Sequence, residues 1–209
     1  MRDPATPFLF GAAVGSGLTA LAVDKAGVDF ILVLNAGRLR IRGASSLACF
    51  LPLRPANEWV FEIAEEEILR RCTSPVLAGL NVRDPAIDPA EIVARARDLG
   101  FAGVCNFPST ALLDGQLRRL AEAEGVGFAK ECQLIRAAAA CGMTSMAYVT
   151  TNREARMMLE AGAEMICVVV GFTGGGTGIS TSLTLEAAAE LANRALEGIP
   201  ASVKTLIEG

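Results

Sequence analysis

The chain of 209 residues has no histidine, one tryptophan and one tyrosine, and its lysines are limited to Lys25, Lys130 and Lys204. Without histidine it lacks the commonest general base and the commonest metal ligand, and Ser-His and Cys-His nucleophile systems are excluded. Any proton transfer would therefore be carried out by a carboxylate, Tyr148, a lysine or a metal-bound water. A Schiff-base mechanism is disfavoured, because Lys204 begins the last predicted strand and the other two lysines lie on predicted helices.

Several classes of protein are disfavoured by what the chain lacks. No apolar run reaches the length of a membrane span, and the first seven residues contain no secretory apolar core. The net charge is −4, and there is no cluster of basic residues to bind nucleic acid. The six cysteines are scattered without a C-x-x-C pair, which favours reduced thiols. We therefore expect a cytoplasmic protein that binds neither membranes nor nucleic acids.

Apolar runs of strand length alternate with helical patterns along the whole chain. The predicted strands span residues 8–14, 30–34, 76–80, 103–107, 144–149, 165–170 and 203–207. Several predicted helices end at a glycine followed by an apolar residue, as at Gly100 and Gly162, and glycine is preferred just beyond a helix. With 52% hydrophobic residues, the chain is most simply one domain over residues 1–209.

Strict alternation of apolar strands and helices is typical of a parallel sheet covered by helices. Because no dinucleotide-binding fingerprint is present, the pattern favours a TIM-type (β/α) barrel over the alternative, a doubly wound open parallel sheet. A complete barrel has eight strands, whereas seven are predicted here, so the eighth βα unit is missing. We therefore expect a homo-oligomer, or a partner chain that covers the open edge of the barrel.

Polar residues follow the predicted strands, at the end where barrel enzymes place their working groups. Asn35, Asn81 and Asn106 each close a mostly apolar run, and together they could hold a carboxylate or an enol oxygen. The alternative is that asparagine is simply a good turn residue after a strand. Glu131 stands at the head of a predicted helix, where it is either a general base, a metal ligand or a carboxylate that favours the helix N-terminus.

Two glycine-containing loops are predicted at the same end of the strands. One is Gly15-Ser16-Gly17 after the first strand, and the other contains Gly174, Gly175 and Gly176 after the sixth. Both precede helices, so their backbone N–H groups could bind a small anion; alternatively, the glycines simply let the chain turn. Arg38, after the second strand, could hold a carboxylate or phosphate as a bidentate fork, or be an ordinary loop charge.

The chain resembles the phosphoenolpyruvate hydrolase-like barrels, also described as a TIM-barrel signal transduction family. The matching segments include Asn35-Ala-Gly-Arg38, Pro75-Val-Leu-Ala-Gly79, Asn106-Phe-Pro108 and Gly171-Phe-Thr-Gly-Gly175, and they extend over nearly the whole chain. The resemblance implies a barrel of the phosphoenolpyruvate and pyruvate-binding type, commonly assisted by Mg²⁺. It also implies a further strand after residue 207, which this chain does not contain.

Two functions follow from the resemblance. The first is a lyase or hydrolase that breaks a C–C or C–P bond in a small 2-oxo acid or phosphonate-type substrate. In that case Glu131, Tyr148 and Asn106 are the catalytic candidates, Asp84 and Glu131 are the candidate Mg²⁺ ligands, and the asparagines, Arg38 and the glycine loops bind the substrate. The second is a non-catalytic ligand-binding or signalling domain that uses the same pocket. One sequence does not separate the two, because a fold does not determine a function.

Overall fold

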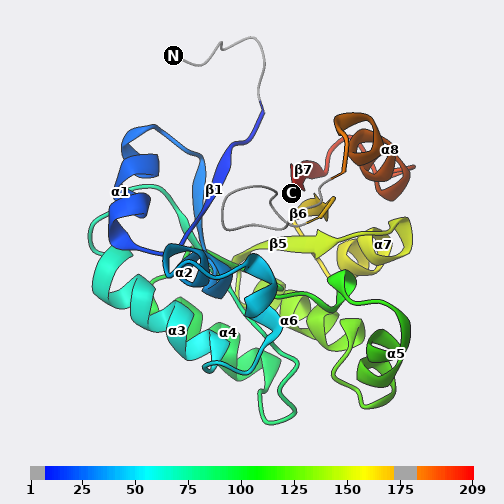
Figure 1. Ribbon diagram of the computed structural model, residues 1–209, viewed down its shortest axis with the longest axis horizontal. Helices are drawn as coiled ribbons and strands as arrows, with labels where there is room; N and C mark the ends of the chain where they lie inside the picture. Colours follow the sequence, from blue (N-terminus) through cyan, green and yellow to red (C-terminus); the bar gives the residue numbers. More distant parts are fainter. Residues whose placement is uncertain (1–7, 172–182) are drawn as a thin grey trace.

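The computed structural model describes residues 8–171 and 183–209 (Figure 1). Seven parallel strands form one curled sheet in which each strand pairs with the next along the chain. The strands are β1 (Gly11–Val14), β2 (Phe30–Val33), β3 (Val76–Gly79), β4 (Gly103–Cys105), β5 (Thr144–Val149), β6 (Met165–Val169) and β7 (Lys204–Glu208). The order β1 to β7 contains no reversal, so the predicted barrel lacking its eighth unit is confirmed and the doubly wound sheet is not adopted.

Helices connect the strands and cover the outside of the sheet (Figure 1). The α-helices are α1 (Gly17–Lys25), α2 (Asn35–Ile41), α3 (Ala56–Ile63), α4 (Pro89–Leu99), α5 (Gly115–Ala123), α6 (Phe128–Ala140), α7 (Asn152–Glu160) and α8 (Leu185–Ala195). Shorter helical segments are η1 (Ser46–Phe50), η2 (Ala64–Ile68), a π-helical turn that extends α3, and η3 (Thr110–Leu112). No helix in the described part of the chain is long and apolar enough to cross a membrane.

The helix ends are determined by local sequence. Asp88 accepts hydrogen bonds from the first N–H groups of α4, and the helix ends at Gly100, whose φ of 97° is a left-handed conformation that favours glycine. At α7, the side chains of Thr151 and Glu154 form a capping box. These caps satisfy backbone groups that a helix end would otherwise leave without partners.

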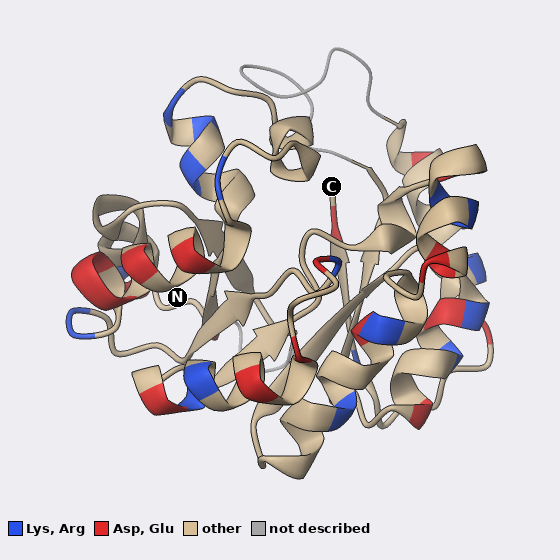
Figure 2. Cartoon of the chain, turned by 90° about the horizontal axis from the view of Figure 1, so that it is seen from below, with Lys and Arg blue, Asp and Glu red and all other residues tan. Residues whose placement is uncertain are grey.

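Side chains alternate between the inside of the barrel and the surrounding helices. On β5, Met146 and Tyr148 belong to the same buried cluster as residues of β2 and β3, whereas Ala147 and Val149 pack with α6, α7 and α8 in a second cluster. Charged residues are concentrated on the helices, and the strands carry few of them (Figure 2). Residues that end a strand on its inner face therefore reach the interior at one end of the barrel, where the first candidate site lies.

Candidate functional site

A cavity of about 290 Å³ opens at the C-terminal ends of the strands. Its walls come from β1, α2, the loop after β4, β5, β6 and β7. The polar groups that face it are Thr19, Arg40, Ser46, Tyr148 and Glu208, together with the backbone of Gly15 and Gly37. Such a volume is large enough for a small organic acid but below the usual range for drug-sized ligands.

Tyr148 and Glu208 form the central pair of this cavity. The Tyr148 hydroxyl donates a hydrogen bond to a carboxylate oxygen of Glu208, the last residue of β7. Burial raises the pKa of the Glu208 carboxyl, and the hydrogen bond from Tyr148 opposes this effect. Burial also raises the pKa of Tyr148, and the neighbouring Glu208 raises it further. The pair is therefore a partly buried proton donor and acceptor, and Glu208 was not among the predicted site residues.

Two thiols lie beside this pair. Cys105 on β4 and Cys167 on β6 both interact electrostatically with Glu208. Burial raises the pKa of each thiol well above its usual value, so neither is a reactive thiolate. The six cysteines are all free, as the sequence predicted.

Asn106 and Glu131 form a buried network next to the cavity. The Glu131 carboxylate accepts hydrogen bonds from Asn106 Nδ2 (2.6 Å), Ser109 Oγ (2.6 Å), and the backbone N and Oγ1 of Thr110 (2.7 Å each). Each of its oxygens thus accepts two hydrogen bonds. Burial raises the pKa of Glu131, and these four hydrogen bonds oppose the shift. The carboxylate from α6 therefore fixes the loop that follows β4.

The Asn106 side chain also joins β4 to β5 beyond their last paired residues. Its Oδ1 accepts from the backbone N–H of Tyr148 at 2.7 Å, and its Nδ2 donates to the Tyr148 carbonyl at 3.1 Å. The carboxamide thus imitates a strand backbone, which positions Tyr148 at the wall of the cavity.

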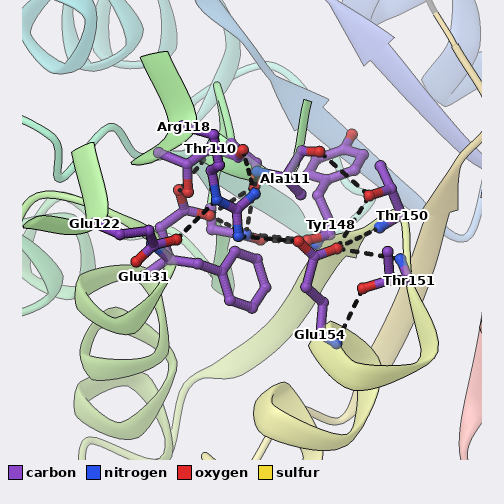
Figure 3. A network of polar contacts seen from close by, with 12 residues as sticks. Thr110, Ala111, Arg118, Glu122, Glu131, Tyr148, Thr150, Thr151 and Glu154 are labelled. Carbon is purple, nitrogen blue, oxygen red and sulfur yellow. Dashed lines mark hydrogen bonds and ion pairs between the residues drawn. The ribbon is translucent and has the colours of Figure 1, made fainter. Parts of the chain in front are cut away.

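Arg118 of α5 ties this network to α7, although the sequence did not indicate it (Figure 3). Its guanidinium donates to the Thr110 carbonyl and pairs with Glu122 and Glu154. The Glu154 carboxylate in turn accepts hydrogen bonds from the backbone N–H groups of Thr150 and Thr151, which follow β5. The loops after β4 and β5 are therefore held together by charge-assisted hydrogen bonds.

Of the other predicted residues that the structure describes, Gly15 lines the first cavity and the rest lie outside its lining. Gly15 lines the cavity, and a Cβ atom there would lie 2.0 Å from the Gly37 carbonyl carbon, so β1 and α2 approach each other closely. Ser16 caps α1 by accepting a hydrogen bond from Thr19 N. Gly17 donates its N–H to Glu67 Oε2 at 2.7 Å.

Arg38 and Asn35 lie on α2 but do not line the cavity. Arg38 forms an ion pair with Glu67 of η2, and Asn35 Nδ2 donates to the Cys49 carbonyl at 3.2 Å. Within the described chain, Asn35 Oδ1 and Arg38 Nε are buried without hydrogen-bond partners. Asn81 and Asp84 border a different cavity, outside β3. The glycines at 174, 175 and 176 lie outside the described residues.

The described residues contain no cluster of side chains that would hold a resident Mg²⁺ ion by several ligands. Mg²⁺ takes an octahedral shell of oxygen ligands that usually includes one or two carboxylates. Glu131 already accepts four hydrogen bonds, and the described residues contain no group of three or more His, Cys, Asp or Glu that could hold a metal. Residues 172–182 add no such side chain. The metal role predicted for Asp84 and Glu131 therefore finds no support in these contacts.

Comparison with known proteins identifies the class to which this barrel belongs. Residues 4–207 match the family described as phosphoenolpyruvate hydrolase-like, and the chain belongs to that family. The resemblance inferred from the Asn-x-Gly-Arg and Asn-Phe-Pro segments is thus confirmed.

Two curated relatives contain this domain within longer chains. Protein y4pA of Sinorhizobium fredii, whose name marks it as a candidate transcriptional regulator, is 40% identical over 205 residues, which are 96% of this chain and 34% of that protein. The ToMV resistance protein Tm-1 of Solanum lycopersicum is 37% identical over 179 residues, which are 85% of this chain and 24% of that protein. The chain thus spans about a third of one relative and a quarter of the other.

Solved structures share the fold at low sequence identity. A phosphonopyruvate hydrolase in complex with oxalate and Mg²⁺ has a TM-score of 0.60 and 16% identity, covering 97% of this chain and 75% of that one. A phosphoenolpyruvate phosphomutase from Streptomyces platensis subsp. rosaceus has a TM-score of 0.58 and 15% identity, covering 98% and 77%. These neighbours establish the barrel architecture. The substrates in their names are those of the neighbouring proteins.

Proposed function

We propose that this domain binds a small 2-oxo acid or phosphonate-type anion in the 290 Å³ cavity and breaks a C–C or C–P bond in it. The observation that carries this proposal is the hydrogen-bonded Tyr148–Glu208 pair, which faces the same cavity as Arg40. Arg40 has no ion-pair partner among residues 8–171 and 183–209, so its guanidinium is free to hold a carboxylate or phosphonate.

The charge of the cavity favours an anion. Because burial raises the pKa of Glu208, this group takes up a proton more readily than an exposed carboxyl, which lowers its repulsion of a negative ligand. When the C–C or C–P bond breaks, its electron pair stays on the carbon next to the carbonyl as an enolate, and water takes up the departing acyl or phosphoryl group. The protonated Tyr148–Glu208 pair gives one proton to that carbon and shares the proton that remains, and the proton released by the water restores the pair.

A second function is ligand binding without turnover. It is favoured by the Glu131 network, in which the carboxylate is occupied by four hydrogen bonds that fix a loop. In this case the cavity would report the presence of a small anion to a further domain.

Calorimetry and a turnover assay on the same samples distinguish the two. A panel of 2-oxo acids and phosphonopyruvate is titrated with and without Mg²⁺, using the natural chain and the variants Tyr148→Phe, Arg40→Gln and, as an exposed control, Glu160→Gln. For an enzyme we expect Tyr148→Phe to keep binding and lose turnover, and Arg40→Gln to lose binding. Binding without turnover in every sample would favour the sensor. No binding in any sample would refute both.

A further inference from the structure

A second cavity, of about 410 Å³, lies beside the end of β3 and shares no lining residue with the first. Its walls are the segment 49–58, which contains the end of η1 and the start of α3, and the segment 81–87 after β3. Apolar side chains form much of this wall, among them Phe50, Leu51, Pro52 and Ile87. Leu51 is 57% exposed, so the rim is open to solvent at this point.

One cation of this cavity, Arg83, is held in a fixed orientation. The Asn57 side chain donates to the Asn81 carbonyl (2.8 Å) and accepts from the Asn81 backbone N–H (2.7 Å). The Asn81 Oδ1 then accepts from both the backbone N and the Nε of Arg83, at 3.0 and 3.2 Å. The guanidinium lies over the Phe50 ring, with 4.9 Å between its carbon and the ring centroid.

The outer nitrogens of this guanidinium remain available. The acids and bases nearby are already engaged: Glu58 forms a two-bond pair with Arg95, and Arg54 pairs with Glu62. Asp84 accepts from the backbone N–H of Ala86. Among the described residues, the two terminal nitrogens of Arg83 make no hydrogen bond or ion pair. The guanidinium of Arg83 is planar, its Nε is fixed, and its two terminal nitrogens are open. This arrangement can bind a carboxylate through two parallel hydrogen bonds.

The surroundings limit the ligand to a single negative charge. Glu58 and Asp84 on the wall would repel a multiply charged anion such as phosphate, whereas the apolar wall accommodates a hydrocarbon group. We propose that this cavity binds a small monocarboxylate with an apolar body, its carboxylate on Arg83 and its apolar part against Phe50, Leu51 and Ile87. This site is independent of the reaction proposed for the first cavity.

The competing explanation is that Arg83 serves only as a counter-charge. Glu131 interacts favourably with it through space, although burial lowers the pKa of Arg83. A counter-charge would be needed for folding and would not respond to a ligand. The two roles can therefore be separated by measuring binding and stability on the same variants.

Calorimetry and ligand-observed NMR with phenylacetate, phenylacetamide and inorganic phosphate test the proposal on the full chain. We expect phenylacetate to bind, and its neutral amide and phosphate to bind at least about tenfold more weakly. The amide lacks the charge that Arg83 pairs with, whereas phosphate lacks an apolar body and its second charge is repelled by Glu58 and Asp84. Arg83→Gln should weaken phenylacetate binding by about tenfold or more. Asp84→Asn should strengthen it slightly by removing a repulsive charge.

A matched pair of leucine variants keeps the test decisive if Arg83→Gln does not fold. Leu51 lines the cavity, whereas Leu53 is 62% exposed and does not. Leu51→Glu should weaken phenylacetate binding severalfold, while Leu53→Glu and Arg40→Gln should leave it within about twofold. Equal binding of acid and amide, phosphate binding as tight as phenylacetate binding, or equal behaviour of the two leucine variants would overturn the proposal.

Discussion

The hydroxyl of Tyr148 and the carboxylate of Glu208 meet inside the barrel although 60 residues separate them along the chain. The strand register explains the meeting. Tyr148 pairs with Cys167 of β6, and Cys167 pairs with Leu206 of β7, so Glu208 lies two residues beyond the level of Tyr148 on the same face as Leu206. The stagger of parallel strands in a barrel thus brings the end of β7 over the tyrosine ring.

The first prediction concerns the pH dependence of stability. Because burial raises the pKa of Glu208 above its unfolded value of about 4.5, the folded chain holds this proton more tightly than the unfolded chain. The contribution of Glu208 to the free energy of unfolding should therefore be fully present below pH 4.5. It should be lost as the pH rises through the pKa of Glu208 in the folded chain. Urea unfolding between pH 4 and 8 measures the free energy of unfolding for the natural chain and for Glu208→Gln. The difference between the two curves should shrink toward acid pH; parallel curves would contradict the assignment.

The element pattern was predictable where local signals agree. The strand predicted at 165–170 is β6 (Met165–Val169). The start of α7 also has a local signal, because Thr151 and Glu154 carry a capping-box signature. The segment after β2 contains α2 and η1, which the alternating pattern of the sequence did not indicate. Since α2 starts at Asn35 directly after the strand, with Leu34 providing no side-chain cap, the sequence lacked a start signal.

The site was predictable only in part, because its contacts join distant segments. Tyr148 was a candidate because it is the one tyrosine of a chain without histidine. Glu208 was missed, although alternation along β7 places it on the same face as Leu206, and that signal was present in the sequence. The bonds of Arg118 to Thr110 and Glu154 depend on how α5 packs, which no local pattern encodes.

The second prediction concerns Glu131. We expect Glu131→Gln to lower the free energy of unfolding by about 1 to 3 kcal/mol, because the amide nitrogen would replace one of the two oxygens. It would then face either the two donors of Thr110 or those of Asn106 and Ser109, which would lack an acceptor. Chemical denaturation measures the loss, with the exposed Glu124→Gln as control. An unchanged midpoint together with abolished turnover would instead support the general-base role considered from the sequence.

The third prediction concerns the contact between β1 and α2. An alanine at position 15 would place its Cβ 2.0 Å from the Gly37 carbonyl carbon, and backbone atoms cannot move aside as a flexible side chain can. Gly15→Ala should therefore destabilise the chain by at least about 1 to 3 kcal/mol and distort the cavity. Gly43→Ala is the matched control: its φ is 83° and nothing lies within 4 Å, so only backbone strain of about 1 kcal/mol is expected. Equal losses would refute a steric origin.

The last prediction concerns the open edge between β1 and β7. In the described structure these two strands each pair on one side only, and a cavity of about 430 Å³ between them is lined by Phe10, Leu206 and Ile207. Phe10 is 55% exposed and Ile207 is 60% exposed, so apolar side chains accompany the unpaired backbone groups. Exposed edges of this kind promote pairing with another chain.

We therefore expect the 209-residue chain to form oligomers or to aggregate when isolated. Size-exclusion chromatography with light scattering measures this across protein concentrations, and thermal unfolding of the same samples should shift with concentration if assembly stabilises the fold. Ile207→Lys places a charge on the edge and should reduce assembly, whereas Leu117→Lys, on the exposed face of α5 with 60% exposure, should not. A natural chain that remains monomeric and unfolds cooperatively at every concentration would show that the edge needs no partner.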